Sequence, residues 1–408
     1  MTDDIGHRPE DIPGIEDAHA SGGVRRRPVT IVRGAGARLW DDTGKEYIDC
    51  ASAHGWTNVG HCHPDVVSAI EQQARCLMAL NESAYNDQRA QWYSTLAGIL
   101  DNQFGTTDRG ALSRIHACNS GAEAVEAALK FARFYTGRTQ FVAFGGGFHG
   151  RTFGALSVTS SRRYREPFDP LVPGVTHVPF NDAGAVAAAV TDDTAGVIVE
   201  IIQGEGGVRE AKAEFIGEVQ RICRERGALF IVDEIQTGFG RTGRWFASQH
   251  VGAEPDIVVL AKALGGGLPM GAAVWRSGLG QFETGLHGST FGAAPLACAA
   301  SIASMRVLER DALPERADAL GKRVHEELRS CVSTPDQPTI VREVRGRGLM
   351  IGVELRRSVT PVLRALVDAG VWALPAGKNV LRLMPPLVIT EEELSRAVGL
   401  VIAALRGA

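Results

Sequence analysis

The sequence has little of what marks membrane-spanning, secreted or nucleic-acid-binding proteins. No apolar run reaches the roughly 20 residues that a membrane-spanning helix needs. Residues 1–14 are acidic and polar and lack the apolar core of a signal peptide, so we expect a cytoplasmic protein with no membrane association. The net charge of −4 gives no indication of a nucleic-acid partner.

Cysteines at disulfide-forming or metal-binding spacing are also missing. The chain has 7 cysteines, an odd number, and no C-x-x-C occurs, which predicts reduced and mostly buried thiols. His61-Cys62-His63 combines metal-ligating residue types but has no distant partner ligands. We interpret it as a turn before a helix that begins at Pro64, and we predict no metal site.

Short apolar runs, by contrast, are plentiful. With 408 residues, of which 44% are hydrophobic, the chain can form a large core and two domains. Residues 1–23 are expected to form a surface-lying arm. Strands are predicted from short apolar or alternating runs, and helices from a 3.6-residue apolar period. The predicted strands are residues 29–32, 37–40, 47–49, 140–144, 197–202, 229–232, 257–260, 341–350 and 351–355, and the predicted helices are 64–80, 91–100, 121–135, 214–226, 295–308 and 391–405.

The stretch from residue 229 to 267 organises the prediction. Its two apolar runs, 229–232 and 257–260, are rich in β-branched residues and read as buried parallel strands. Asp233 follows the first run and Lys262 follows the second. The carboxyl ends of parallel strands are where open α/β sheets bind ligands, so an acid and an amine there form a candidate site. The alternative is that Asp233 caps a following helix and Lys262 is solvated.

Two glycine-containing turns are candidate binding loops. Asn119-Ser120-Gly121-Ala122-Glu123 leads into a helix whose first N–H groups and dipole would hold an anion, unless Ser120 is only an ordinary N-cap. Gly145-Gly146-Gly147 follows a strand and suggests a nucleotide-binding protein as an alternative. Neither G-x-G-x-x-G before a helix nor G-K-[ST] is present, which disfavours that alternative.

A long, ordered signature runs through the central stretch. It reads Val232-Asp233-Glu234-Ile235-Gln236-Thr237-Gly238, then Gly240-Arg241-Thr242-Gly243, then Leu260-Ala261-Lys262-Ala263-Leu264-Gly265-Gly266-Gly267. This signature resembles that of class III aminotransferases, which are pyridoxal-phosphate (PLP) enzymes of fold type I, and the resemblance extends from about residue 29 to 401. It implies an α/β fold with a large domain built on a mostly parallel seven-stranded sheet, and a smaller α+β domain built from the N- and C-terminal segments. The implied division is residues 1–60 for the arm and first small-domain segment, 61–303 for the large PLP-binding domain, and 304–408 for the C-terminal small domain.

The resemblance also implies roles for single residues. Lys262 would form a Schiff base with the PLP aldehyde and, once displaced, carry a proton between substrate and cofactor carbons. Asp233 would pair with the pyridine nitrogen and keep it protonated. The other implied cofactor-binding residues are Ser120, Gly121 and Ala122 at the phosphate, Phe148 and Ile235 on the two ring faces, Gln236 at the ring 3-oxygen, His149, Ser289 and Thr290. Thr290 would reach the phosphate of the neighbouring subunit, so that a homodimer shares its active sites.

The implied substrate-binding residues are Tyr85, Arg151, Glu205 and Arg382. Arg151 resembles the arginine that binds the substrate carboxylate. Arg382 would bind the α-carboxylate of glutamate or 2-oxoglutarate. Glu205 would pair with Arg382 while the amino donor is bound, because a lone buried arginine is costly. Trp56 stands where relatives carry smaller residues and would reshape the pocket.

The run 376–389 most resembles acetylornithine aminotransferases, whose nearest relatives act on a lysine or ornithine precursor capped by an acidic carrier protein. The implied reaction moves the terminal amino group of an Nα-blocked ornithine or lysine to 2-oxoglutarate, giving the semialdehyde and glutamate. The alternatives are an ornithine, 4-aminobutyrate or diaminobutyrate aminotransferase, an aminomutase or epimerase, and a catalytically idle protein of the same fold. Two basic runs, at residues 25–27 and 162–165, would attract an acidic carrier if they flank the entrance, and are otherwise solvated loops.

Overall fold

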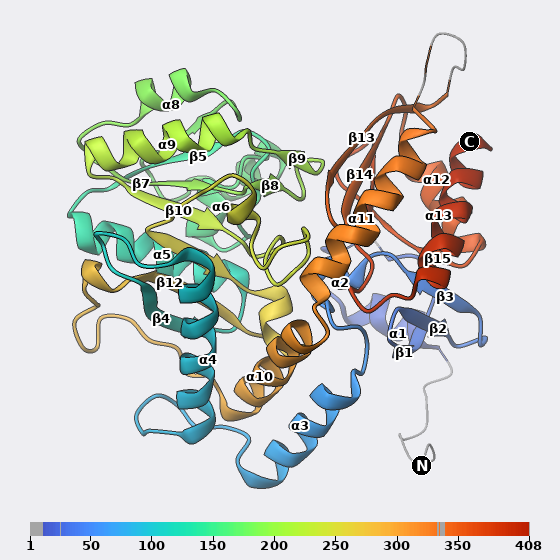
Figure 1. Cartoon of the computed structure of the whole chain (residues 1–408), viewed down its shortest axis with the longest axis horizontal. Coiled ribbons are helices and arrows are strands. Elements are labelled where there is room, and N and C mark those ends of the chain that lie inside the picture. The colour runs from blue at the N-terminus through green and yellow to red at the C-terminus, as the bar shows by residue number, and fades with distance from the viewer. Residues whose placement is uncertain (1–10, 25, 333, 335–338, 408) are drawn as a thin grey trace.

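A seven-stranded sheet lies at the centre of the larger part of the molecule (Figure 1). The computed structural model describes residues 11–24, 26–332, 334 and 339–407. The strand order is β4-β12-β11-β10-β7-β5-β6, and β12 runs antiparallel to both of its neighbours while the other pairs are parallel. The predicted mostly parallel seven-stranded sheet is confirmed. Its strands are β4 (Leu112–Cys118), β5 (Gln140–Phe144), β6 (Val175–Val178), β7 (Thr194–Val199), β10 (Leu229–Asp233), β11 (Ile257–Leu260) and β12 (Gly271–Arg276).

Helices cover both faces of this sheet, because its central strands are apolar on both sides. In β10, Phe230 and Val232 belong to a core shared with α8 and α9. Leu229 and Ile231 belong to a second core, shared with α5. Alternate side chains of a strand point to opposite faces, so one continuous apolar run serves two cores. These helices are α5 (Gly121–Thr136), α6 (Phe153–Val158), α8 (Ala183–Ala189) and α9 (Ala213–Arg226).

Two smaller sheets are built from the ends of the chain. The first has the order β1-β2-β3-β15, so a strand from the C-terminal part pairs in parallel with one from the N-terminal part. The second, β13-β14-β17-β16, is antiparallel and packs with α11 and α12. The two termini therefore build the smaller part together (Figure 1), whereas the boundaries at residues 60 and 303 stay predictions. The elements are β1 (Ile31–Ala35), β2 (Arg38–Asp41), β3 (Glu46–Asp49), β13 (Val341–Arg347), β14 (Met350–Leu355), β15 (Val371–Trp372), β16 (Leu374–Pro375), β17 (Val380–Leu383), α11 (Leu313–Arg329), α12 (Thr360–Asp368) and α13 (Glu391–Arg406).

Long helices connect the two parts. Helix α10 packs against α3 and α4 and is followed directly by α11 of the smaller part (Figure 1). Short elements lie around the junction. The bounds are α2 (Ser52–Gly55), α3 (Pro64–Cys76), α4 (Asp87–Phe104), α7 (Arg162–Arg165), β8 (Ile202–Gln203), β9 (Arg209–Glu210) and α10 (Pro295–Arg310).

Several predicted elements have different ends in the structure. The helix predicted to reach residue 80 stops at Cys76, because Leu77 is extended and its carbonyl accepts from the side chain of Gln73. The strand predicted to reach residue 202 stops at Val199, because the carboxylate of Glu200 turns to accept two loop amides. The predicted arm contains a helix, α1 (Ile12–His19), none of whose residues is buried. The predicted spans 29–32, 91–100 and 341–350 correspond to β1, α4 and β13.

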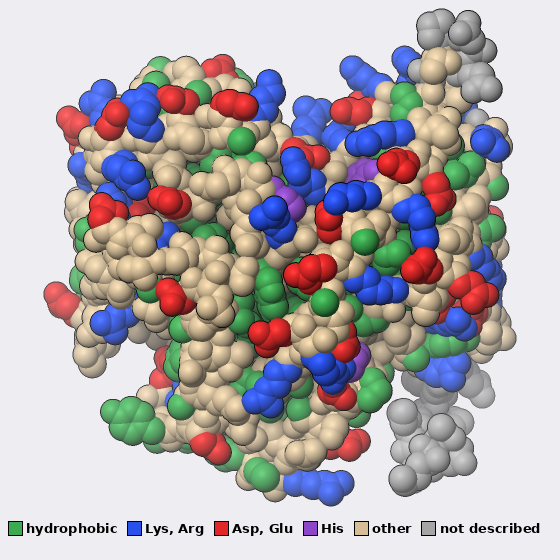
Figure 2. All heavy atoms as spheres, viewed as in Figure 1, with side chains coloured by type: hydrophobic (Ala, Val, Ile, Leu, Met, Phe, Trp, Pro, Cys, Tyr) green, Lys and Arg blue, Asp and Glu red, His purple; other side chains and the backbone are tan. Residues whose placement is uncertain are grey.

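The described residues were compared with two kinds of site that the sequence did not predict, a membrane span and a metal cluster. In the described part of the chain, no helix is both long and apolar enough to cross a membrane. Among the same residues, no group of three or more His, Cys, Asp and Glu is placed to hold a metal ion. His61 lies 2.8 Å from Asp49 instead, and His63 caps α3 as the predicted turn requires. On the face drawn in Figure 2, basic and acidic side chains are interspersed over both parts of the molecule.

Candidate active site

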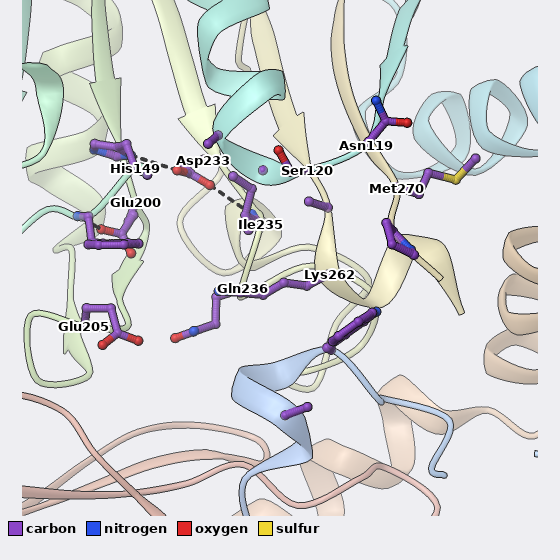
Figure 3. Close-up of a pocket in the computed structure, with 18 of the residues that line it drawn as sticks. Asn119, Ser120, His149, Glu200, Glu205, Asp233, Ile235, Gln236, Lys262 and Met270 are labelled. Carbon is purple, nitrogen blue, oxygen red and sulfur yellow. Dashed lines mark hydrogen bonds and ion pairs between the residues drawn. The ribbon is translucent and has the colours of Figure 1, made fainter. Parts of the chain in front are cut away.

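A cavity of about 360 Å³ opens at the carboxyl edge of the large sheet. Residues that follow β4, β5, β7, β10 and β11 line it, and α2 from the N-terminal segment lies on the opposite side (Figure 3). Asp233 ends β10 and Lys262 follows the neighbouring strand β11, and both line this cavity. The acid and the amine therefore meet where parallel sheets bind ligands.

His149 holds the carboxylate of Asp233. The Nδ1 atom of His149 lies 2.7 Å from Asp233 Oδ2, and the backbone N–H of Ile235 donates to Oδ1 at 3.0 Å (dashed lines in Figure 3). Burial lowers the pKa of His149, but the hydrogen bond and charge of Asp233 outweigh burial and raise it. The protonated Nδ1 that this favours fixes the direction in which the carboxylate faces the cavity.

Lys262 enters the cavity from a strained backbone position. It begins the short turn η3 (Lys262–Gly265) with φ of +50°, and such conformations persist where surrounding contacts enforce them. Burial lowers the pKa of the Lys262 amine, and the charge of Arg382 acts in the same direction against the opposing carboxylates. A lowered pKa increases the share of neutral amine, which is the nucleophilic form.

The first turn of α5 offers unpaired amides to the cavity. Ser120 is the N-cap: its hydroxyl accepts from Glu123 at 3.2 Å and its carbonyl from Ala124 at 3.1 Å. The N–H groups of Gly121 and Ala122 lie before the first intrahelical acceptor, and both residues line the cavity. A Cβ at Gly121 would lie 2.8 Å from the Ile235 side chain, so glycine is needed for this close approach. The turn is therefore both a serine cap and a cradle for an anion.

The Gly145-Gly146-Gly147 loop, in contrast, uses its amides internally. Gly145 donates to Val178 at 2.8 Å, Gly146 to Ser160 Oγ at 2.9 Å and Gly147 to Phe144 at 3.0 Å. None of these three N–H groups is left for a phosphate. This pairing counts against the nucleotide-binding alternative.

Glu200 ties together the two loops that carry Phe148 and Glu205. Its Oε1 accepts from the Phe148 amide at 2.8 Å and its Oε2 from the Gly204 amide at 3.1 Å. Burial raises the pKa of Glu200 above its usual value, although the nearby His149 opposes the shift. This carboxyl group therefore fixes the loop positions on one side of the cavity.

Arg382 lies behind two residues that line the cavity, Glu205 and Gln236. Its side chain is fully buried, and its Nη1 donates to Glu205 Oε1 at 2.6 Å and to Gln236 Oε1 at 3.1 Å. Its Nε has no hydrogen-bond partner. Burial by itself would raise the pKa of Glu205, but His54, Arg382 and Lys262 together lower it well below its usual value. Glu205 is therefore an anion in contact with a buried cation, the arrangement that a movable mask requires.

The comparisons with known proteins agree with this geometry. A family model described as aminotransferase class III matches residues 20–405. The chain belongs to the class III aminotransferases. An acetylornithine aminotransferase from Methanopyrus kandleri is 46% identical to this aminotransferase over 93% of the chain and 95% of the relative. A protein named [LysW]-aminoadipate semialdehyde transaminase, from Deinococcus radiodurans, is also 46% identical, over 94% of the chain and 87% of the relative.

Solved structures of aminotransferases share the fold. The ornithine aminotransferase of Toxoplasma gondii superposes with a TM-score of 0.90 at 34% identity and covers 97% of this chain and 94% of its own. The acetylornithine aminotransferase of Elizabethkingia anophelis gives 0.83 at 31% identity, with 97% coverage of this chain and 98% of its own. Fold type I is thereby confirmed.

The cofactor of this aminotransferase is PLP, as its family and its PLP-containing structural neighbours show. The cavity offers the donor set that PLP needs. Lys262 supplies an amine, Asp233 an acid for a ring nitrogen, and the start of α5 unpaired amides for a phosphate. Phe148 and Ile235 line the cavity as predicted and are available to the two faces of a ring.

Five predicted residues lie outside the cavity lining of their own chain, and one of them, Arg382, contacts the lining residues Glu205 and Gln236. Tyr85 is fully exposed, and Thr290 is exposed as well. Ser289 accepts a hydrogen bond from the Asn119 side chain at 3.2 Å, next to the phosphate turn. Arg151 is exposed and stacks on the ring of Tyr164, with its guanidinium carbon 4.4 Å from the ring centroid. The single chain thus brings together the implied PLP contacts except Ser289 and Thr290, and two of the four implied substrate contacts.

The sequence analysis gave no role to several residues that the structure places in the site. His54 reaches Arg382, and Glu200 anchors two loops, although both are only isolated polar residues in the sequence. The signal for Glu200 is an acidic residue within an otherwise apolar run, at the point where β7 ends in the structure. The other cavity-lining residues without a predicted role are Ala53, Asn119, Gly150, Ala261, Leu268, Pro269 and Met270.

Proposed function

We propose that this aminotransferase moves the terminal amino group of an Nα-blocked ornithine or lysine to 2-oxoglutarate, giving a semialdehyde and glutamate. The observation that carries the proposal is the buried Arg382 in contact with Glu205. A dicarboxylic acid needs a cation for its α-carboxylate, whereas an amino donor that lacks a carboxylate at this position needs that cation neutralised. One arginine with one movable carboxylate serves both substrates.

We assign each of the following residues a separate role in the reaction. When bound, PLP supplies an electron sink for the bond-breaking steps. Lys262, with its lowered pKa, accepts and returns the proton at the reacting carbon. Asp233, oriented by His149, would hold the ring nitrogen, and the first turn of α5 would hold the phosphate. Gln236 is proposed to donate to the ring 3-oxygen. An aminomutase or epimerase would have no use for the Glu205–Arg382 pair.

The proposed donor side depends on Arg151. It lies one residue beyond Gly150, which lines the cavity, and its stacking on Tyr164 holds the guanidinium near the mouth. A planar guanidinium binds a carboxylate through two hydrogen bonds, so Arg151 is proposed to take the α-carboxylate of the donor. The names of the two relatives at 46% identity indicate the caps to test first: an acetyl group and a LysW-linked group.

The active site is proposed to be completed by a second copy of the chain. Thr290 and Tyr85 are exposed, and beside them Phe291 and Met78 expose 69% and 56% of their surfaces. Exposed apolar side chains of this size mark contact surfaces. In the proposed homodimer, Thr290 of one subunit reaches the phosphate held by the other.

The deciding experiment is a panel of amino donors with 2-oxoglutarate. Nα-acetylornithine, Nα-acetyllysine, a LysW-linked substrate, ornithine and 4-aminobutyrate are compared by kcat/KM, with glutamate as the measured product. We expect one of the Nα-blocked donors to exceed ornithine by at least tenfold. Ornithine as the best donor would instead support the second candidate, ornithine aminotransferase, which is the name of one structural neighbour at 34% identity. Absence of glutamate formation with every donor would contradict the proposal.

A further inference from the structure

Four successive residues next to the cavity adopt left-handed backbone conformations. In α2, the φ values are +45° for Ser52, +47° for Ala53, +64° for His54 and +87° for Gly55. For a residue other than glycine, this conformation costs on the order of 1–2 kcal/mol. The turn is held at its first residue, since Asp49 Oδ1 accepts from the Ser52 amide at 3.0 Å and the Ser52 hydroxyl donates to the Met384 carbonyl at 2.6 Å.

The turn delivers His54 to the guanidinium of Arg382. Arg382 Nη2 donates to His54 Nδ1 at 3.2 Å, so this ring nitrogen acts as an acceptor. The Gln236 amide donates to the His54 carbonyl at 3.2 Å, and its oxygen accepts from Arg382 Nη1 at 3.1 Å. His54, Gln236 and Arg382 thus form a closed ring of hydrogen bonds around a buried cation. This ring does not include Glu205.

The two sides of Arg382 are therefore held differently. On Nη1, the partner is Glu205, whose side chain is 35% exposed and lies on the loop after β8. On Nη2, the partner is His54, whose backbone is held in the left-handed turn, although its side chain is 58% exposed and its Nδ1 lies 3.9 Å from Glu205 Oε1. When Glu205 moves away, Gln236 remains on Nη1 and His54 is the acceptor on Nη2. Without an acceptor there, the buried group would have Nε and Nη2 both unpaired, which is costly.

We propose that His54 is a positioning residue for substrate carboxylates: its Nδ1 holds the Arg382 guanidinium in its binding orientation after Glu205 has left. The inference rests on the proposed function, because it assigns Arg382 to carboxylate binding. His54 is not among the residues that line the cavity. Its effect is on how well Arg382 receives the α-carboxylate of 2-oxoglutarate or glutamate.

Two substitutions separate the ring acceptor from the backbone turn. Asparagine and glycine both tolerate a positive φ. In His54→Asn, the side-chain oxygen takes nearly the place of Nδ1 and can accept from Arg382. In His54→Gly, the turn is preserved and the acceptor is lost. A difference between the two variants therefore reports on the hydrogen bond and not on the strain of the turn.

The measurement is binding of glutarate, an unreactive dicarboxylate, to the PLP-loaded enzyme by calorimetry. We expect the Kd of glutarate to rise about tenfold in His54→Gly, the size expected for a charge-assisted hydrogen bond. In His54→Asn, Kd stays within about twofold of the parent enzyme. In the 2-oxoglutarate half-reaction, the same loss appears in KM with kcat nearly unchanged. Unchanged binding in His54→Gly, or binding in His54→Asn as weak as in His54→Gly, would overturn the inference.

Arg382→Lys serves as the reference variant. If it weakens glutarate binding while His54→Gly does not, the inference about His54 is wrong and the proposed role of Arg382 stands. If Arg382→Lys binds glutarate as well as the parent enzyme, Arg382 is not the carboxylate site. In that case the proposed function and the inference both fail.

Discussion

The contact between Glu205 and Arg382 predicts which half-reaction the Glu205→Ala substitution slows, and by how much. Replacing Glu205 by alanine leaves Arg382 buried and positively charged, with Gln236 and His54 as neutral partners. The lost contact joins a fully buried cation to a carboxylate whose side chain is 35% exposed. Exposed pairs are worth up to about 1 kcal/mol, and removing one partner of a buried pair costs about 3–5 kcal/mol. Discounted for the exposure of Glu205, the expected cost is about 2 kcal/mol.

This cost falls on one half-reaction only. The amino donor must bind beside an unmasked guanidinium, and about 2 kcal/mol corresponds to a loss of roughly 30-fold in its kcat/KM. Glutamate brings its own α-carboxylate to Arg382 and no longer has to displace Glu205, so its half-reaction is unchanged or faster. Both half-reactions are followed by stopped-flow absorbance of the bound PLP. Glu166→Gln, which alters an exposed pair with Arg162, is the matched control. Equal losses in both half-reactions of Glu205→Ala would show that Glu205 is structural and not a mask.

Three further predictions follow from individual groups. Lys262→Ala removes the cavity amine, and we expect loss of the Schiff-base absorbance and of nearly all turnover; substantial activity would contradict its assignment. Burial lowers the pKa of His325 to about 4, and the ordinary value is about 6.5, so the neutral form is favoured in the fold. The stability that this group contributes is complete above about pH 6.5 and is lost as the pH falls towards 4, by up to about 3 kcal/mol. The free energy of unfolding, measured with urea, should depend less on pH in His325→Leu than in the parent protein over this range. If the two proteins show the same pH dependence, His325 is not its cause. For a carrier-linked substrate, we expect less than about a twofold gain in kcat/KM at low salt, because Arg26 and Arg162 are paired with carboxylates of their own chain. A tenfold gain that Arg25/Arg26/Arg27→Ala abolishes would instead demonstrate steering.

The basic runs show how tertiary contacts change the meaning of a charge pattern. Arg25 lies outside the described residues, but the other two arginines of this run, Arg26 and Arg27, form contacts within the chain. Arg26 pairs with Glu16 and Asp17 of α1, and Arg27 donates to the Ala373 carbonyl and stacks on Trp372. The segment therefore fastens the N-terminal helix to the smaller part of the molecule. A run of arginines in the sequence does not reveal these partners, because they come from distant elements.

Most of the large sheet could be predicted because its strands are specified locally. The runs 229–232 and 257–260 are apolar and β-branched throughout, and they form β10 and β11 as expected. Strands β4 and β6 were not predicted, and neither was β12. Its sequence, Gly271 to Arg276, begins with glycine and two alanines, which have low strand propensity. It is extended because it lies between β11 and β4 and pairs with both. Neighbouring strands here override local preference.

Some residues of the cavity region could likewise be predicted from the sequence, and others could not. Asp233 and Lys262 could be placed from the sequence because they follow predicted strands, and parallel strands bring their carboxyl ends to one edge. The Ser120 turn could be placed because it leads into a predicted helix. His54 could not. Three consecutive residues other than glycine do not adopt left-handed conformations by local preference. Contacts from Asp49 and Met384, the latter more than 300 residues away, hold the Ser52 turn in place. Strain that only tertiary contacts can maintain is uncommon in a protein without a use for it. Here its consequence is a ring nitrogen placed against a buried arginine, which is why we assign the turn to the handling of substrate carboxylates and not to the folding of the N-terminal sheet.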